Sequence, residues 1–314
     1  MTKLIAAAVL ALLLAIAIPS AALACACGCG IFDVGTSSMF PTHPGGMVYL
    51  EYDFMNQNQN WIGTSAAPAS ANSDKRIETG FFIAGIQYMY SRKWGMMVEV
   101  PFDRRKFTTD INPDFPTGTP DIQTFNHGAL GDVRLKAIYT GFSPDMSTGL
   151  TFGLRLPTGD HTYANFDPDT ELGSGSTDLL LGGFHRGSLG VGYWNWFANA
   201  QWDQPFLASL YDPGSEIDGA LGVDYAGWQA GSYKISPILQ VDGSARQHDT
   251  GPLADPLDSG YSRILLMPGL EVHAGDYHIY ADVGFPVYQN MYASGGTGQL
   301  TAHELFKVNV SRYF

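Results

Sequence analysis

Three cysteines lie close together near the start of the chain, in the run Cys25-Ala26-Cys27-Gly28-Cys29-Gly30. Thiolates two residues apart can wrap a soft metal ion such as Cu(I) or Zn(II). The alternatives are a disulfide, which can be intermolecular because the number of cysteines is odd, and lipidation of Cys25. Cys25, Cys27 and Cys29 are therefore candidate ligands for copper or zinc, and the sequence requires no other cofactor.

Charged side chains are the second candidate for chemistry, because they recur at alternate positions of long segments. Glu99, Arg134 and Arg155 belong to three successive segments, and in neighbouring strands they would form a cross-strand ladder of charges. Around a lumen, such a ladder filters solutes by charge. The alternative is that the charges neutralise one another inside a narrow barrel. The candidate pore-lining residues are Glu51, Asp53, Glu99, Asp103, Asp132, Arg134, Lys136, Arg155, Arg263, Glu271, His278 and Asp282.

A hydrolase with its active site at the outer rim of a barrel would need a serine, a histidine and an orienting acid or amide close together there. His127, His161, His248 and His303 lie near the expected rim, and serines are plentiful. No motif brings such a triad together. We expect no enzymatic activity and assign no catalytic residue.

The elements that position these residues have an unusual composition. Only 15% of the 314 residues are charged, against about 25% in soluble domains. Thirty acidic and 17 basic residues leave a net charge of −13, which argues against a nucleic-acid partner. Few charges, 40 aromatic residues and 37 glycines suit a chain that exposes part of its surface to lipid.

The first 24 residues have the features of a secretory signal peptide. Lys3 precedes an apolar run from Leu4 to Ile18, and Ala22-Leu23-Ala24 forms a small-residue cleavage site. The run is too short for a transmembrane helix. We therefore expect a signal peptide at 1–24 and a mature chain that begins at Cys25. Residues 25–45 are expected to form a periplasmic or plug segment that contains the cysteines.

From about residue 46 onward, apolar and polar residues alternate with a period of two, as in strands with two different faces. Val48, Leu50 and Tyr52, for example, alternate with Glu51 and Asp53. Twelve strands are expected, near residues 46–56, 78–91, 94–108, 127–141, 147–158, 175–187, 190–203, 217–226, 231–243, 260–273, 276–287 and 302–314.

The connections between these strands alternate between short and long. Turns of two to five residues alternate with long links at 57–77, 109–126, 159–174, 204–216, 244–259 and 288–301. Six long loops without structure would be unusual in a compact soluble domain. They are typical of outer-membrane barrels, which have short periplasmic turns and long extracellular loops. The sequence predicts an all-β, transmembrane antiparallel β-barrel over 46–314, with Trp194, Trp196 and Trp202 facing lipid.

Several motifs resemble a family of bacterial outer-membrane barrels, the putative transporters of the MetA pathway of phenol degradation. The resemblance covers residues 128–314 and rests on Gly131-Asp132-Val133-Arg134, Leu154-Arg155-Leu156-Pro157-Thr158-Gly159, Gly173-Ser174-Gly175-Ser176-Thr177-Asp178, Phe285-Pro286-Val287-Tyr288-Gln289, Gly298-Gln299-Leu300 and Tyr313-Phe314. It implies passage of small, often aromatic, compounds across the outer membrane, and it implies no catalytic residue.

A barrel of twelve strands encloses a lumen of intermediate width, wider than that of small filled barrels and narrower than that of large aqueous porins. We therefore expect an outer-membrane channel for small solutes with a narrow, charge-lined lumen. The alternative is a structural or surface-exposed barrel without transport. The expected partners are outer-membrane lipid, lipopolysaccharide bridged to acidic loops by divalent ions, and a small-molecule solute.

Overall fold

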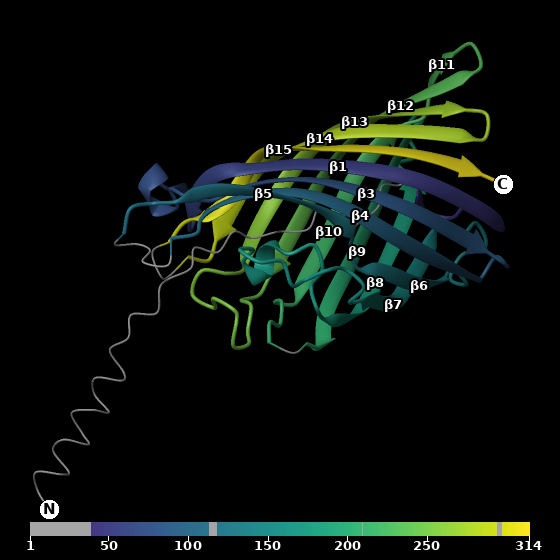
Figure 1. The fold of residues 1–314 in the computed structure, drawn as a ribbon. Helices are drawn as coiled ribbons and strands as arrows, with labels where there is room; N and C mark the ends of the chain where they lie inside the picture. Colours follow the sequence, from purple (N-terminus) through teal and green to yellow (C-terminus); the bar gives the residue numbers. More distant parts are fainter. Residues whose placement is uncertain (1–38, 113–117, 209, 294–296) are drawn as a thin grey trace, which may run out of the picture.

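The strands form one antiparallel sheet that closes on itself into a barrel (Figure 1). The computed structural model describes residues 39–112, 118–208, 210–293 and 297–314. Around the barrel the strands follow the order β10-β9-β8-β7-β6-β4-β3-β1-β15-β14-β13-β12, and pairing of β10 with β12 closes the ring. The predicted twelve-stranded antiparallel barrel is confirmed.

Eleven of the twelve strands of the ring have at least nine residues, which is long enough to cross a membrane at a tilt. Their bounds are β1 Gly45–Ile62, β3 Arg76–Met89, β4 Trp94–Asp110, β6 Val133–Tyr139, β7 Thr148–Leu156, β8 Thr177–Ser188, β9 Trp194–Leu207, β10 Glu216–Tyr225, β12 Tyr233–Arg246, β13 Tyr261–Ala274, β14 Tyr277–Met291 and β15 Gln299–Tyr313. Smaller elements extend the ends of the barrel, namely β2 Ser65–Ala66, β5 Ile122–Leu130, β11 Trp228–Ala230 and the 3-10 helices η2 Ala69–Ala71 and η3 Pro168–Thr170.

The strands expected to end at residues 56 and 287 run on to Ile62 in β1 and to Met291 in β14. Two further differences from the expected boundaries have a local reason. The strand expected at 127–141 begins earlier, at Ile122, and is interrupted at Gly131-Asp132, so that β5 and β6 both pair with β4. The strand expected from residue 190 begins at Trp194. Gly190 and Gly192 have φ values of 71° and 57°, a left-handed conformation that glycine adopts without strain, and they form the turn instead.

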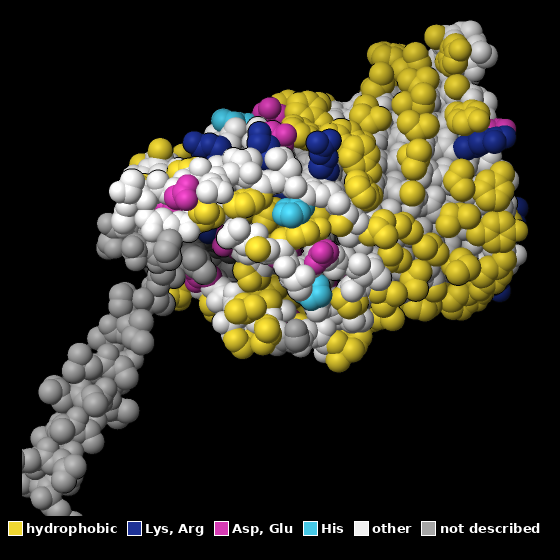
Figure 2. All heavy atoms as spheres, in the orientation of Figure 1, with side chains coloured by type: hydrophobic (Ala, Val, Ile, Leu, Met, Phe, Trp, Pro, Cys, Tyr) yellow, Lys and Arg dark blue, Asp and Glu magenta, His cyan; other side chains and the backbone are white. Residues whose placement is uncertain are grey.

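The two faces of each strand have opposite chemistry. In β1, Leu50 is 67% exposed while its neighbour Glu51 is 8% exposed and Asp53 is 1% exposed. Polar residues thus point into the barrel and apolar residues point out, the reverse of a soluble protein and the arrangement of a barrel in lipid. Figure 2 shows the apolar side chains gathered over the right half of the barrel, near the short turns, with polar and charged side chains towards the long loops.

Aromatic residues mark the end of the barrel that carries the short turns. Trp94 packs on Tyr139 with ring centroids 4.7 Å apart, and Trp194 packs on Tyr225 at 5.1 Å. Such rings lie at the membrane–water interface. The short-turn end is the periplasmic end by the usual orientation of outer-membrane barrels. In the described parts of the chain, no helix is long and apolar enough to cross a membrane.

Candidate functional site: the barrel interior

Among the cavities lined by the described residues, three follow one another inside the barrel. A periplasmic cavity of about 590 Å³ opens at the short turns and is lined by residues such as His43, Glu271 and Tyr313. A small central cavity of about 80 Å³ follows. An outer cavity of about 160 Å³ lies beneath the long loops.

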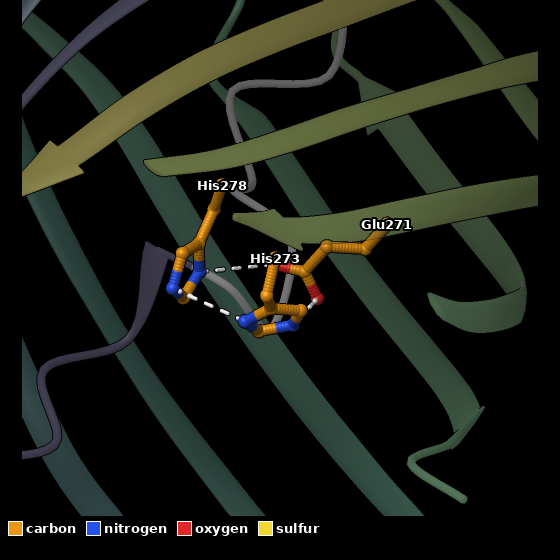
Figure 3. Close-up of side chains that lie close together, drawn as sticks. All are labelled: Glu271, His273 and His278. Carbon is orange, nitrogen blue, oxygen red and sulfur yellow. Dashed lines mark hydrogen bonds and ion pairs between the residues drawn. The ribbon is translucent and has the colours of Figure 1, made fainter. Parts of the chain in front are cut away.

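Two strands and a tight turn build one wall of the periplasmic cavity. Glu271 and His273 are two residues apart on β13 and therefore share a face. The turn at Gly275 leads into β14, where His278 pairs directly with His273. Figure 3 shows the three side chains converging from the two strands. The imidazole nitrogens His273 Nδ1 and His278 Nε2 lie 3.1 Å apart.

The segment before β1 enters the lumen and divides the cavities. Met39 lines the outer and central cavities, whereas Thr42 and His43 line the periplasmic one. Phe40 stacks on Phe184 with ring centroids 4.6 Å apart and meets Phe197 edge-on. We call Met39-Phe40-Pro41-Thr42-His43 the plug segment. It fills the narrow middle of the barrel with apolar side chains.

The outer cavity is charged. Ten acidic and five basic side chains line it, so its wall attracts cations. On one side Lys136 Nζ lies 3.1 Å from Glu99 Oε2, and the Tyr49 hydroxyl donates a 2.6 Å hydrogen bond to the same carboxylate. On another side Lys307 Nζ lies 3.4 Å from Glu51 Oε1. Several of these charges are thus paired across strands.

The three residues of the expected charge ladder are neighbours in register. Glu99 pairs with Arg134 between β4 and β6, and Arg134 pairs with Arg155 between β6 and β7. The ion pairs do not all follow this register. Glu99 pairs with Lys136, two positions beyond Arg134, and Arg155 pairs with residues of the next two strands. Arg155 Nε donates to Asp178 at 2.6 Å, and its Nη1 lies 3.4 Å from Asp203. The row of charges therefore continues beyond the three residues of the expected ladder, onto β8 and β9.

Three of the six motifs that carry the family resemblance meet at one place in the wall. Asp132, at the break between β5 and β6, accepts hydrogen bonds from Gly159 N at 2.9 Å and Ser174 Oγ at 2.6 Å. A Cβ atom on Gly173 would lie 2.4 Å from the Gly159 carbonyl oxygen, so glycine is required for this close approach. These residues clamp the base of the 157–176 connection.

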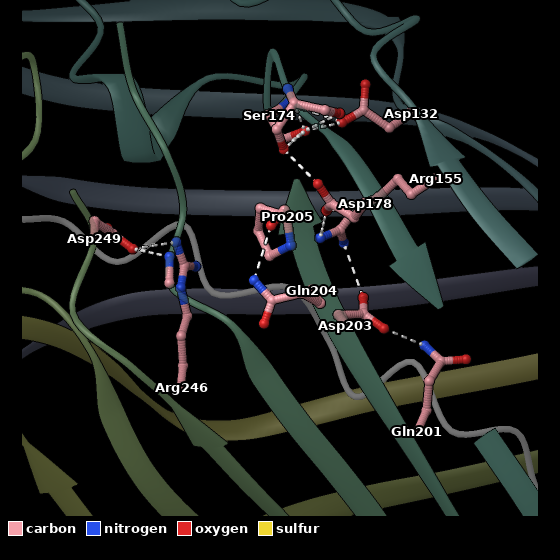
Figure 4. A network of polar contacts seen from close by, with 12 residues as sticks. Asp132, Arg155, Ser174, Asp178, Gln201, Asp203, Gln204, Pro205, Arg246 and Asp249 are labelled. Carbon is pink, nitrogen blue, oxygen red and sulfur yellow. Dashed lines mark hydrogen bonds and ion pairs between the residues drawn. The ribbon is translucent and has the colours of Figure 1, made fainter. Parts of the chain in front are cut away.

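Figure 4 shows how this clamp continues into the charged row. Ser174 and Ser176 are hydrogen-bonded to each other, and Ser176 Oγ donates to Asp178 at 2.6 Å. Asp178 in turn holds Arg155. Across the mouth, Arg246 Nη2 lies 2.7 Å from Asp249. Asp132, expected to line the pore, thus also holds a loop.

The connection between β7 and β8, residues 157–176, folds over the outer cavity. Arg105 on β4 donates hydrogen bonds to the carbonyl oxygens of Thr170 and Glu171, and Lys75 forms an ion pair with Asp167. Phe166 packs into a cluster with Ile77, Phe107 and Leu300 on the inner wall. We call residues 157–176 the inner loop.

Burial raises the pKa of Glu171 in this loop to about 8, and the charge of Asp160 adds to the rise while Arg105 opposes it. A released loop would carry a carboxyl group with an ordinary pKa near 4.3. Between these two pKa values, the folded-in loop binds a proton on Glu171 that the released loop does not bind. The stability of the folded-in loop relative to the released loop therefore falls as the pH rises from about 4.3 to about 8.

We expect a spin label at Ala164→Cys to become more mobile as the pH is raised from 5 to 9, in protein whose native cysteines are replaced by serine. Glu171→Gln cannot ionise and is expected to flatten this pH profile while leaving the label immobile. An equally steep profile in Glu171→Gln would show that another group controls the loop.

The structure places the twelve candidate pore-lining residues in four groups. Glu271 and His278 line the periplasmic cavity, and Lys136 lines the central cavity. Arg263 and Asp282 are buried on the inner face without lining any of these cavities; Arg263 lies over the Tyr261 ring, and Asp282 accepts a hydrogen bond from Tyr280. The residues at the outer cavity are Glu51, Asp53, Glu99, Asp103, Asp132, Arg134 and Arg155.

Some functional residues lay outside that set. Arg105 lies two positions after Asp103 on β4, so the alternation itself would have placed it inside. The plug residues Met39 and Phe40 precede the alternating pattern, and no periodicity signals them. Cys25, Cys27 and Cys29, like the expected signal peptide, lie outside the described residues, so metal binding by the cysteines stays a prediction.

Comparisons with known proteins agree with this architecture. No protein-family model matches the sequence, and no curated protein matches it. The crystal structure of the COG4313 outer membrane channel from Pseudomonas putida F1 is similar to it, with a TM-score of 0.64 and 12% identity over 90% of this chain and 100% of that one. The β domain of the Bordetella autotransporter BrkA has a TM-score of 0.51 and 12% identity over 86% of this chain and 100% of that domain.

At this level of identity the likeness establishes the fold alone. The chain has the fold of outer-membrane β-barrel proteins, and its apolar belt belongs in the outer membrane. The resemblance to the phenol-degradation transporter family stays a prediction.

Proposed function

We propose that this protein is an outer-membrane channel for small solutes, with a narrow, charge-lined lumen that the plug segment closes in the conformation described. The observation that carries the proposal is the row of cavities inside the barrel, in which the plug segment separates the polar periplasmic cavity from the charged outer cavity. A barrel that served only as a scaffold would have no need of a periplasmic cavity of about 590 Å³.

The charges of the lumen indicate the solute class. With ten acidic and five basic side chains on its wall, the outer cavity favours small cations and dipolar molecules over anions. The similarity of this barrel to the COG4313 outer membrane channel supports a transport role for this protein. Outer-membrane lipid and lipopolysaccharide would surround the apolar belt and the acidic loops.

The mature chain is proposed to begin at Cys25 after removal of residues 1–24, and the cysteines are proposed to bind copper or zinc or to form a disulfide. No catalytic role is proposed. A structural or surface-exposed barrel remains the competing function, and conductance separates it from a channel.

The reversal potential of the mature protein in planar bilayers under a salt gradient is the test. We expect a modest preference for cations, and we expect Arg134→Ala to increase it because the wall loses a positive charge. Asp103→Asn is the matched opposite change and should reduce the preference. Arg155→Ala is a less suitable variant, because it leaves buried Asp178 without its ion-pair partner, at a cost of about 3–5 kcal/mol.

Reversal potentials that are the same in both variants and the parent would mean that the charges only neutralise one another. Absence of any conductance, in the parent and in the plug variants described below, would favour the structural barrel.

A further inference from the structure

A cluster of two histidines and a glutamate stands at the periplasmic end of the lumen, apart from the charged row (Figure 3). Glu271 and His273 lie on one face of β13, and His278 faces them from β14. Gly275, with φ of 64°, makes the tight turn that brings the two strands back on each other. A short hairpin fixes all three, so their relative position does not depend on a long loop.

The three side chains offer ligand atoms at close range. One atom from each residue can be chosen so that all lie within 4.8 Å of one another. His273 Nε2 and His278 Nδ1 each lie 3.3 Å from a Glu271 carboxylate oxygen. A zinc ion bound at about 2.0–2.1 Å needs ligand atoms roughly 3.3 Å apart. Side-chain rotation supplies the remaining adjustment.

Two of these atoms lack a hydrogen bond in the described structure. Glu271 Oε1 and His278 Nδ1 are buried and make no hydrogen bond within the described structure, although they are 3.3 Å apart. Buried polar atoms are normally hydrogen-bonded or bound to a cation, because burial without a partner is costly. A cation between the carboxylate and the imidazoles would satisfy both atoms at once.

The surroundings favour a cation. Besides the histidines, the walls of the periplasmic cavity carry four carboxylates and two basic groups, namely Asp145, Asp224, Glu271 and Asp276 with Arg186 and Lys234. The ligand side chains are only partly exposed, at 7% for Glu271, 24% for His273 and 20% for His278. They border a cavity of about 590 Å³, which leaves room for a water or solute ligand at a fourth position.

We propose that Glu271, His273 and His278 bind one divalent transition-metal ion, with zinc as the best match, at the periplasmic mouth of the barrel. Two imidazoles and one carboxylate are a donor set that suits Zn²⁺ and related ions and leaves a coordination position open. The site goes beyond the proposed channel function, since it requires neither conductance nor the N-terminal cysteines.

The test is calorimetric titration of Zn²⁺ into the mature, folded protein in detergent, with the native cysteines replaced by serine. We expect one bound ion per chain. His273→Ala combined with His278→Ala should lower the affinity by more than about 100-fold, since loss of supporting residues alone costs 10–100-fold. Glu271→Gln keeps the shape of the side chain and should also weaken binding.

His303→Ala, which alters a histidine at a cavity lined by β1, β3, β4 and β15, is the matched control and should bind zinc like the parent. The heat-dependent gel shift of folded barrels checks that each variant is folded. Zinc bound equally well by the parent and the double histidine variant would overturn the proposal, as would cysteine-free protein that binds no zinc. Channel conductance is unaffected by either outcome, so the two proposals fail separately.

Discussion

Replacing Met39 and Phe40 by alanine is expected to raise the single-channel conductance severalfold. Phe40 is 6% exposed and is held between Phe184 and Phe197. The central cavity around it measures about 80 Å³, against about 590 Å³ on the periplasmic side. Apolar side chains at a constriction also exclude water and ions. The double substitution removes both the obstruction and the apolar surface.

Planar-bilayer recordings of the parent and of Met39→Ala/Phe40→Ala protein, under the same salt conditions, check this expectation. Phe142→Ala is the matched control, because Phe142 is 58% exposed at the periplasmic rim and its removal should leave the conductance unchanged. Equal conductance in the parent and the double variant would mean that the plug segment is not the narrowest point. The inner loop would then be the next candidate.

The architecture of this chain could be predicted because lipid imposes a strict pattern on every strand. Leu50 and Glu51 are adjacent, yet one faces lipid and the other faces the lumen, so alternation alone assigns each residue to a side. The alternation of short and long connections then determines which end of each strand faces the periplasm. Both signals are local, and both survive in a single sequence.

The contents of the lumen could not be predicted in the same way. The plug segment was expected either in the periplasm or inside the barrel, and nothing periodic distinguished the two. The inner loop carries Tyr163, Phe166 and Leu172, apolar residues that are unusual in a solvated loop and that indicate inward folding. Their partners on β3, β4 and β15 are far away in the sequence, so only the closed barrel identifies them.

The histidine cluster could be predicted from the sequence only in part. Period-two alternation places Glu271, His273 and His278 on the inner face, and the expected turn at Ala274-Gly275 was correct to within a residue. Their convergence depends on the exact pairing of His273 with His278. A shift by one residue would have turned His278 towards lipid. Register, rather than composition, creates this candidate site.

The central claim is that solutes pass through the lumen, and blocking the lumen covalently is its most direct test. The background is Met39→Ala/Phe40→Ala protein with Cys25, Cys27 and Cys29 replaced by serine. Asp103→Cys introduces a thiol inside the barrel, where Asp103 is 6% exposed, and Phe102→Cys introduces one on the outer face, where Phe102 is 45% exposed.

Current through single channels is recorded before and after addition of a charged, water-soluble methanethiosulfonate reagent. We predict that the reagent abolishes most of the current through Asp103→Cys protein and leaves the current through Phe102→Cys protein unchanged. Undiminished current through Asp103→Cys protein, when mass spectrometry shows that the thiol has reacted, would contradict a conducting lumen.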